Sequence, residues 1–151
     1  MVAQNPNYNP LAEGELWILF SMGRAMLLES GMPPEHWAAA FVYAAYIYNR
    51  LPKYYARLHH VTTPYALLHH QAQPSLKHIR LFGCTCHALL KQSELKRNKL
   101  GSRTVTGFFV GFTRRAVSGV LVYVPNLNKY VIASTVKTDE RRLFKSPSAP
   151  H

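Results

Sequence analysis

Apolar residues in the first half of the chain recur at helical spacing. They predict a helix from about Ala12 to Glu29, which ends at Ser30-Gly31 because glycine suits a helix end. Pro33-Pro34 opens a second predicted helix, since proline is tolerated in the first turn. Its apolar positions recur at i, i+4, i+7, i+8 and i+11, which is one helical face: Trp37, Phe41, Ala44, Ala45 and Tyr48.

A short third helix is predicted after the second one ends near Asn49–Pro52. The basic, tyrosine-containing stretch from Lys53 to His60 is interpreted as a connector. Thr63 and Pro64 then form a cap and a first-turn pair, so a short helix is expected through His70.

From Ser75 onward the pattern changes to short runs that are typical of strands. Gly107 and Gly111 interrupt one of these runs, as glycines do at bulges and tight bends. Four or five such strands predict a small closed barrel, and the fold class is α+β. The predicted strands are Ile79–Leu90, Val105–Thr113, Gly119–Val124 and Lys129–Val136, with residues 125–128 as a hairpin loop and a loose tail at 143–151.

Composition and charge indicate a folded, basic protein. With 151 residues and 48% hydrophobic content, the chain is large enough to build a core, so wholesale disorder is excluded. A formal net charge of +11 favours an anionic partner, with nucleic acid ahead of a membrane surface. A solvated basic surface, or the absence of an acidic neighbour, is the alternative interpretation.

The cysteines and the apolar runs indicate an intracellular location. Cys84 and Cys86 are the only cysteines, and their spacing suits neither an internal disulfide nor a secreted framework. No signal peptide is evident, and the apolar run at 16–20 is broken by Ser21 and Gly23, too soon for a membrane span. No membrane partner and no small-molecule substrate are expected.

Several short segments occur along the chain in a fixed order: Ala12-Glu13, Arg24–Gly31, His36-Trp37, Tyr48–Pro52, Thr63–Tyr65, His78–Cys84, Lys99-Leu100, Gly107–Phe112 and Tyr123–Pro125. Together they resemble a copia-type (Pseudoviridae) retrotransposon Pol polyprotein. The resemblance covers roughly residues 9–140 and corresponds to the C-terminal half of the integrase. It implies that residues 12–70 are the incomplete helical tail of an RNase H-like core and that residues 76–142 form an SH3-like β-barrel.

The resemblance places Glu13 at the glutamate of the family's Asp-Asp-Glu catalytic triad. Two-metal phosphoryl transfer requires several carboxylates around cations about 4 Å apart. Asp139 is the only aspartate in the chain, and it lies far downstream. Glu13 is therefore interpreted as a vestigial catalytic residue and the chain as not an enzyme. No cofactor is expected, since Mg²⁺ or Mn²⁺ would bind only in a complete integrase.

The chain departs from the family pattern around this glutamate. A basic residue and then polar residues usually follow it, whereas Gly14, Glu15, Leu16 and Trp17 follow it here. Apolar side chains at these positions remove contacts to DNA phosphates. The departures are consistent with a decayed or shortened element.

Zinc binding is considered and set aside. The histidines and cysteines form close groups at His59-His60, His69-His70 and Cys84-Thr85-Cys86-His87. Structural zinc usually takes two ligand pairs with wider spacing, and a Cys-x-Cys strand provides only one pair on one face. No metal site is therefore predicted in this chain alone.

The basic residues around the predicted barrel strands are the DNA-binding candidates. Exposed cations on neighbouring loops would neutralise phosphates without reading sequence. The nearby aromatic residues Phe108, Phe109, Phe112 and Tyr123 are assigned to the core. The candidates are Lys91, Lys96, Arg97, Lys99, Arg103, Arg114, Arg115, Arg141 and Arg142.

The first predicted helix supports an alternative function as a protein-interaction module that uses exposed amphipathic helices and has no nucleic-acid role. Apolar residues cover nearly all of its sides between Leu16 and Met22, and such a helix is buried or pairs with a partner. In an intact integrase it would lie against the catalytic sheet, so the missing core or other integrase subunits are expected partners beside DNA. The location would then be the nucleus, and a subunit completed in trans is a third possibility.

Overall fold

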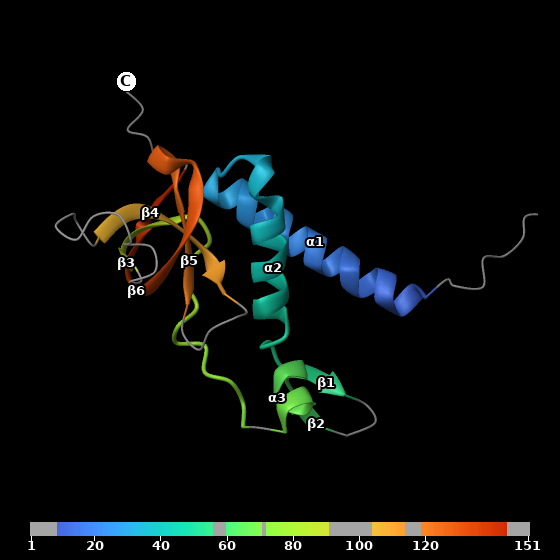
Figure 1. Ribbon diagram of the computed structural model, residues 1–151. Helices are drawn as coiled ribbons and strands as arrows, with labels where there is room; N and C mark the ends of the chain where they lie inside the picture. The colour runs from blue at the N-terminus through green and yellow to red at the C-terminus, as the bar shows by residue number, and fades with distance from the viewer. Residues whose placement is uncertain (1–8, 56–59, 71, 91–103, 114–118, 145–151) are drawn as a thin grey trace, which may run out of the picture.

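The computed structural model describes residues 9–55, 60–70, 72–90, 104–113 and 119–144. Figure 1 shows a helical part beside a small barrel, with a short hairpin and a helix below them. This arrangement confirms the α+β fold class. The elements are α1 (Pro10–Ser30), η1 (Pro34–His36), α2 (Trp37–Tyr48), β1 (Lys53–Tyr55), β2 (His60–Thr62), α3 (Pro64–His69), β3 (Cys84–Leu90), β4 (Thr104–Phe112), β5 (Val120–Val124), η3 (Pro125–Leu127) and β6 (Lys129–Leu143).

Helix α1 ends where the sequence predicts, but it begins at Pro10, ahead of the expected start near Ala12. The Asn9 side chain accepts a hydrogen bond from the backbone N–H of Ala12 at 3.3 Å, and Pro10 occupies the first turn. Gly31 ends the helix with φ of 69°, a left-handed conformation that glycine adopts without a steric penalty.

Helix α2 lies between α1 and the barrel, so it is covered on two sides (Figure 1). The predicted single buried face is therefore only partly right. Trp37 on that face is 59% exposed, whereas Ala40 and Tyr43, outside it, are buried. Phe41 meets Phe20 of α1 with ring centroids 4.9 Å apart. Tertiary packing, rather than helical periodicity alone, decides which side chains of α2 are buried.

The stretch interpreted as a connector, Lys53 to His60, contains the strand β1 and the first residue of β2. β1 and β2 pair antiparallel, with Lys53 opposite Thr62. The connector interpretation was wrong at these residues because three-residue strands leave no readable alternation. The short helix α3 is confirmed, with Thr63 Oγ1 accepting from the Ala66 N–H at 3.1 Å.

Four antiparallel strands form the barrel. β3 pairs with β4, β4 with β5 and β5 with β6, and β6 returns to pair with β3, so the sheet closes on itself. A register shift between Phe109 and Gly111 marks a bulge, and Gly111 has φ of 135°. Phe109 and Val110 are both buried at this bulge, although neighbouring side chains of a regular strand point to opposite faces. β6 is longer than predicted and continues past Val136 to Leu143.

One hydrophobic core joins the helical part to the barrel. Met32, Ala40 and Tyr43 from the helical part pack in the same cluster as Phe109 and Val122 of the barrel. Leu143 and Phe144, which the sequence analysis placed in the loose tail, contact this core, and the Phe144 ring lies 4.8 Å from that of Phe108. Residues 145–151 of the predicted tail lie outside the described residues.

A buried histidine also ties the helical part to the barrel. His36 Nδ1 lies 2.6 Å from the Tyr130 hydroxyl, and its ring contacts that of Tyr123 at 4.3 Å. Burial lowers the pKa of His36, with the Glu35 charge acting in the opposite direction. The neutral imidazole therefore suits this position.

None of the helices in the described residues is long and apolar enough to cross a membrane.

Candidate functional site

Glu13 lies in the first turn of α1 and is exposed to solvent. No hydrogen bond or ion pair in the described part of the chain involves its carboxylate. Within that part, no group of three or more His, Cys, Asp or Glu side chains could hold a metal ion. The vestigial role of Glu13 stays a prediction.

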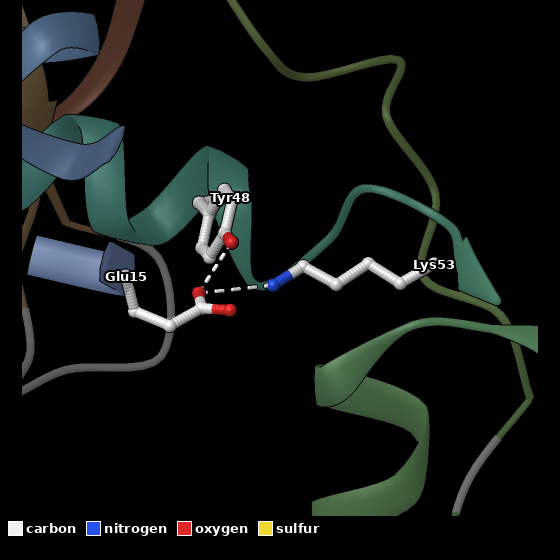
Figure 2. A network of polar contacts seen from close by, with 3 residues as sticks. All are labelled: Glu15, Tyr48 and Lys53. Atoms are coloured by element: carbon white, nitrogen blue, oxygen red, sulfur yellow. Dashed lines mark hydrogen bonds and ion pairs between the residues drawn. The ribbon is translucent and has the colours of Figure 1, made fainter. Parts of the chain in front are cut away.

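Glu15 points to a different side of α1 from Glu13 and contacts residues of α2 and β1. Its Oε2 atom accepts hydrogen bonds from the Tyr48 hydroxyl and from Lys53 Nζ, the latter at 3.2 Å (Figure 2). Lys53 Nζ also lies 3.5 Å from the centre of the Tyr48 ring. The Tyr48 hydrogen bond lowers the pKa of Glu15, which stabilises its charged form. Glu15 therefore links α1 to Tyr48 of α2 and to Lys53 of β1.

Most of the predicted DNA-binding residues lie outside the described residues. Arg141 and Arg142 are described, and both are exposed on β6. Arg142 Nε lies 3.6 Å from Asp139 Oδ2, while no ion pair within the described ranges involves Arg141. The candidates outside the described residues are Lys91, Lys96, Arg97, Lys99, Arg103, Arg114 and Arg115.

A basic residue that sequence reasoning missed lies beside Arg141. Lys137 and Arg141 are exposed on β6, and Lys137 pairs across the sheet with the exposed His87 of β3. Asp139 lies between Lys137 and Arg141 along β6, so this part of the strand carries both positive and negative charge. The pairing with β3 shifts register after Asp139, because Thr85 lies opposite Asp139 whereas Cys84 lies opposite Leu143, so regular alternation does not extend to Arg141. The charge of Lys137 was the signal available in the sequence.

Glu140 and Asp139 are both engaged locally. Glu140 Oε1 accepts from the backbone N–H of Leu81 at 3.3 Å, and Asp139 accepts from the N–H of Arg141 at 3.1 Å. These contacts use part of the acceptor capacity of both carboxylates. At this end of β6, Lys137 and Arg141 are exposed cations. Neither forms an ion pair with a carboxylate in the described part of the chain.

The cysteine-histidine group of β3 is divided between the two faces of the sheet. Cys84 and Cys86 are fully buried and free, whereas His87 is exposed and lies 3.0 Å through Nδ1 from Thr106 Oγ1. Burial raises the pKa of the Cys84 thiol to about 11 and that of Cys86 to about 12. Metal binding requires thiolates, so these protonated core thiols do not suit it.

The four aromatic residues that the sequence analysis assigned to the core lie in it or pack against it, as predicted. Phe109 is fully buried, and Tyr123 is almost completely buried. Phe108 and Phe112 are partly buried and pack against the same core. Tyr130 of β6, by contrast, is 43% exposed.

A small four-stranded barrel with a helical lead-in defines the class of this protein, and comparison with known families agrees. Residues 84–151 match the retroviral polymerase SH3-like domain family. The match confirms the predicted SH3-like β-barrel.

The chain is also similar to two retrotransposon proteins. It is 28% identical over 136 residues to the retrovirus-related Pol polyprotein from transposon RE2 of Arabidopsis thaliana, covering 90% of this chain and 9% of that protein. It is 26% identical over 135 residues to the corresponding RE1 polyprotein of the same plant, covering 89% of this chain and 9% of the relative. No solved structure gives a significant match. The chain is therefore related to a short section of copia-type retrotransposon Pol polyproteins that includes the SH3-like domain.

Proposed function

We propose that this chain is a non-catalytic section of retrotransposon integration machinery that binds DNA non-specifically through its SH3-like barrel. The observation that carries this proposal is the exposed pair Lys137 and Arg141 on β6, in a chain of net charge +11. Cations of this kind neutralise phosphates and release counterions. The similarity to retrotransposon Pol polyproteins supports the proposal.

The proposed binding is insensitive to DNA sequence. Phe108, Phe109, Phe112 and Tyr123 lie in the core or pack against it, and flexible lysine and arginine side chains contact phosphates rather than base edges. Residues 91–103 join β3 to β4, and residues 114–118 join β4 to β5. The basic side chains of these two connections are the further phosphate contacts in the proposal.

Salt dependence tests the proposal in the full chain. If about five phosphates are neutralised, the logarithm of the DNA association constant should fall against log salt with a slope of roughly −4 to −5. Fluorescence anisotropy with duplexes of unrelated sequence, over a salt series, measures this slope. A chain that has no affinity at low salt while circular dichroism shows it folded would contradict the proposal.

A matched pair of variants locates the binding surface. The double substitution Lys137→Glu and Arg141→Glu is expected to reduce the salt slope by about 2, since each phosphate contact contributes about 1. Arg24→Glu with Lys77→Glu makes the same charge change at exposed sites outside the barrel strands and is expected to leave most of the slope intact. Equal losses in both variants would contradict binding through the barrel.

Glu13→Ala tests the non-catalytic assignment. DNA affinity is expected to stay unchanged, with or without Mg²⁺, because Glu13 belongs to no group of three or more potential metal ligands among the described residues. Anisotropy titrations in Mg²⁺ and in a chelator measure this. A clear loss of affinity that depends on Mg²⁺ would show that Glu13 binds metal in this chain.

A second candidate function is supported by the surface of α1. Trp17 is 73% exposed, and Leu16, Ile18 and Phe20 are also exposed, as the sequence analysis predicted for a helix without its sheet. Large apolar side chains grouped on one surface usually mark an interaction site. On this alternative, the chain is an interaction module whose partner is the rest of an integrase core or another integrase subunit, in the nucleus.

A further inference from the structure

A groove of about 750 Å³ lies between α2, α3 and the barrel. Its lining is mainly apolar and includes Val42 and Tyr46 of α2, Leu68 of α3 and Phe112 of β4. Leu68 is 75% exposed, and Val42 is also exposed, so both present apolar surface to solvent. A groove of this size can take several side chains of a partner.

The charge in the groove is positive. The Arg50 guanidinium carbon lies 3.5 Å from the ring centre of Tyr46 and 4.5 Å from that of Tyr65. Its Nη1 atom donates to the backbone oxygen of Tyr46 at 3.0 Å, which fixes the planar group in the groove. None of the described residues that line the groove is acidic, and no ion pair in the described ranges involves Arg50. An occupant with a carboxylate would form an ion pair with the Arg50 guanidinium.

A surface with the complementary character exists on the same chain. Glu13, Leu16, Trp17 and Phe20 of α1 are spaced at i, i+3, i+4 and i+7, so they form one stripe along the helix. All of these side chains are exposed, and the Glu13 carboxylate has no partner in the described part of the chain. This N-terminal half of α1 extends away from the barrel (Figure 1). We call these residues the α1 stripe.

We propose that the α1 stripe of one molecule docks in the groove of a second copy of this chain. Trp17 and Phe20 would contact the apolar lining, and the Glu13 carboxylate would pair with the Arg50 guanidinium. Charge complementarity favours this occupant, because the groove has a cation and no acid while the stripe begins with an unpaired acid. Arg24, the next residue along the stripe, would lie at the end away from Arg50.

The proposed contact is heterologous, since the stripe and the groove are different surfaces. Each molecule then keeps one free surface after the first contact, and association continues to larger species or a closed ring. A stripe-to-stripe dimer, by contrast, would leave the groove unused. Variants of the two surfaces can therefore distinguish the two arrangements.

Sedimentation velocity of the full chain without DNA, over a concentration series at about 0.15 M salt to screen the net charge, tests the proposal. The unmodified chain is expected to associate. Trp17→Asp in the stripe and Leu68→Asp in the groove are each expected to weaken association at least about tenfold. A 1:1 mixture of the two variants is expected to form dimers and nothing larger, because each variant supplies one intact surface. Leu127→Asp, at an exposed site outside both surfaces, is the control and should associate normally.

A charge exchange gives a second measurement. Glu13→Arg is expected to weaken association about tenfold, and adding Arg50→Glu to the same chain should restore it. Circular dichroism checks that every variant is folded. Normal association by Leu68→Asp would overturn the proposal and indicate stripe-to-stripe pairing. An unmodified chain that stays monomeric, or a mixture of the two aspartate variants that does not associate, would overturn it as well.

Discussion

Replacement of Tyr43 by alanine is expected to lower the free energy of unfolding by about 3–5 kcal/mol. Tyr43 is 2% exposed and joins α2 to the barrel, with its ring centroid 5.3 Å from that of Phe109. Its hydroxyl donates to the backbone oxygen of Arg80 at 2.6 Å and accepts from the Arg80 N–H at 3.1 Å. The alanine variant loses the packing and leaves both Arg80 groups without this partner. Urea denaturation followed by circular dichroism measures the change.

Two further variants separate the contributions at this position. Tyr43→Phe keeps the ring and removes the hydroxyl, so a loss of about 1–2 kcal/mol is expected. Burial raises the pKa of Tyr43 to about 12, so the hydroxyl stays a neutral donor at ordinary pH. Tyr54→Ala, at a side chain 64% exposed, should change stability by less than about 0.5 kcal/mol. A nearly neutral Tyr43→Ala would mean that the helical part and the barrel do not share a core.

Gly107→Ala is expected to destabilise the chain by about 3 kcal/mol. A Cβ atom at this position of β4 would lie 2.5 Å from the backbone oxygen of Tyr123 and 2.7 Å from Val122 Cγ1. Backbone oxygens of a paired strand cannot move away without disturbing the β4–β5 hydrogen bonds. Thermal and urea unfolding of the variant measure the loss.

The matched control is Gly14→Ala. Its Cβ would meet nothing within 4 Å, and residue 14 lies inside α1, so a gain of about 0.5–1 kcal/mol is expected. The same chemical change should therefore have opposite signs at the two positions. Destabilisation of similar size in both variants would contradict the close approach of β4 and β5.

The elements with local signals were predictable from the sequence. The cap at Thr63, the glycine end of α1 and the glycine bulge in β4 each depend on residues within a few positions of one another. Elements that depend on contacts between residues far apart in the sequence were not predictable. The role of Tyr43 is set by β4, and the extension of β6 to Leu143 is set by its pairing with β3, in which Cys84 lies opposite Leu143. The charged end of β6 lacks the alternation of apolar and polar residues from which a strand is predicted.

The candidate site was predictable in its chemistry and less so in its geometry. Counting charges identified the basic connections and the Arg141-Arg142 pair, but not Lys137, which is exposed on the same strand as Arg141. The opposite orientations of Glu13 and Glu15 followed from helical spacing, whereas the contact of Glu15 with Tyr48 and Lys53 required the fold. The predicted roles of the seven basic residues outside the described ranges stay predictions.

The order of strands has a consequence for synthesis of the chain on the ribosome. β6 is the last strand, and it alone bridges β5 and β3. Until residue 143 has emerged, β3 has an unpaired edge, and an open edge can recruit another strand. Helix α2 emerges much earlier and can cover the apolar face of β4 while the nascent sheet is open. We therefore expect the helical part to shield apolar surface of the barrel during translation, until the final strand completes the sheet.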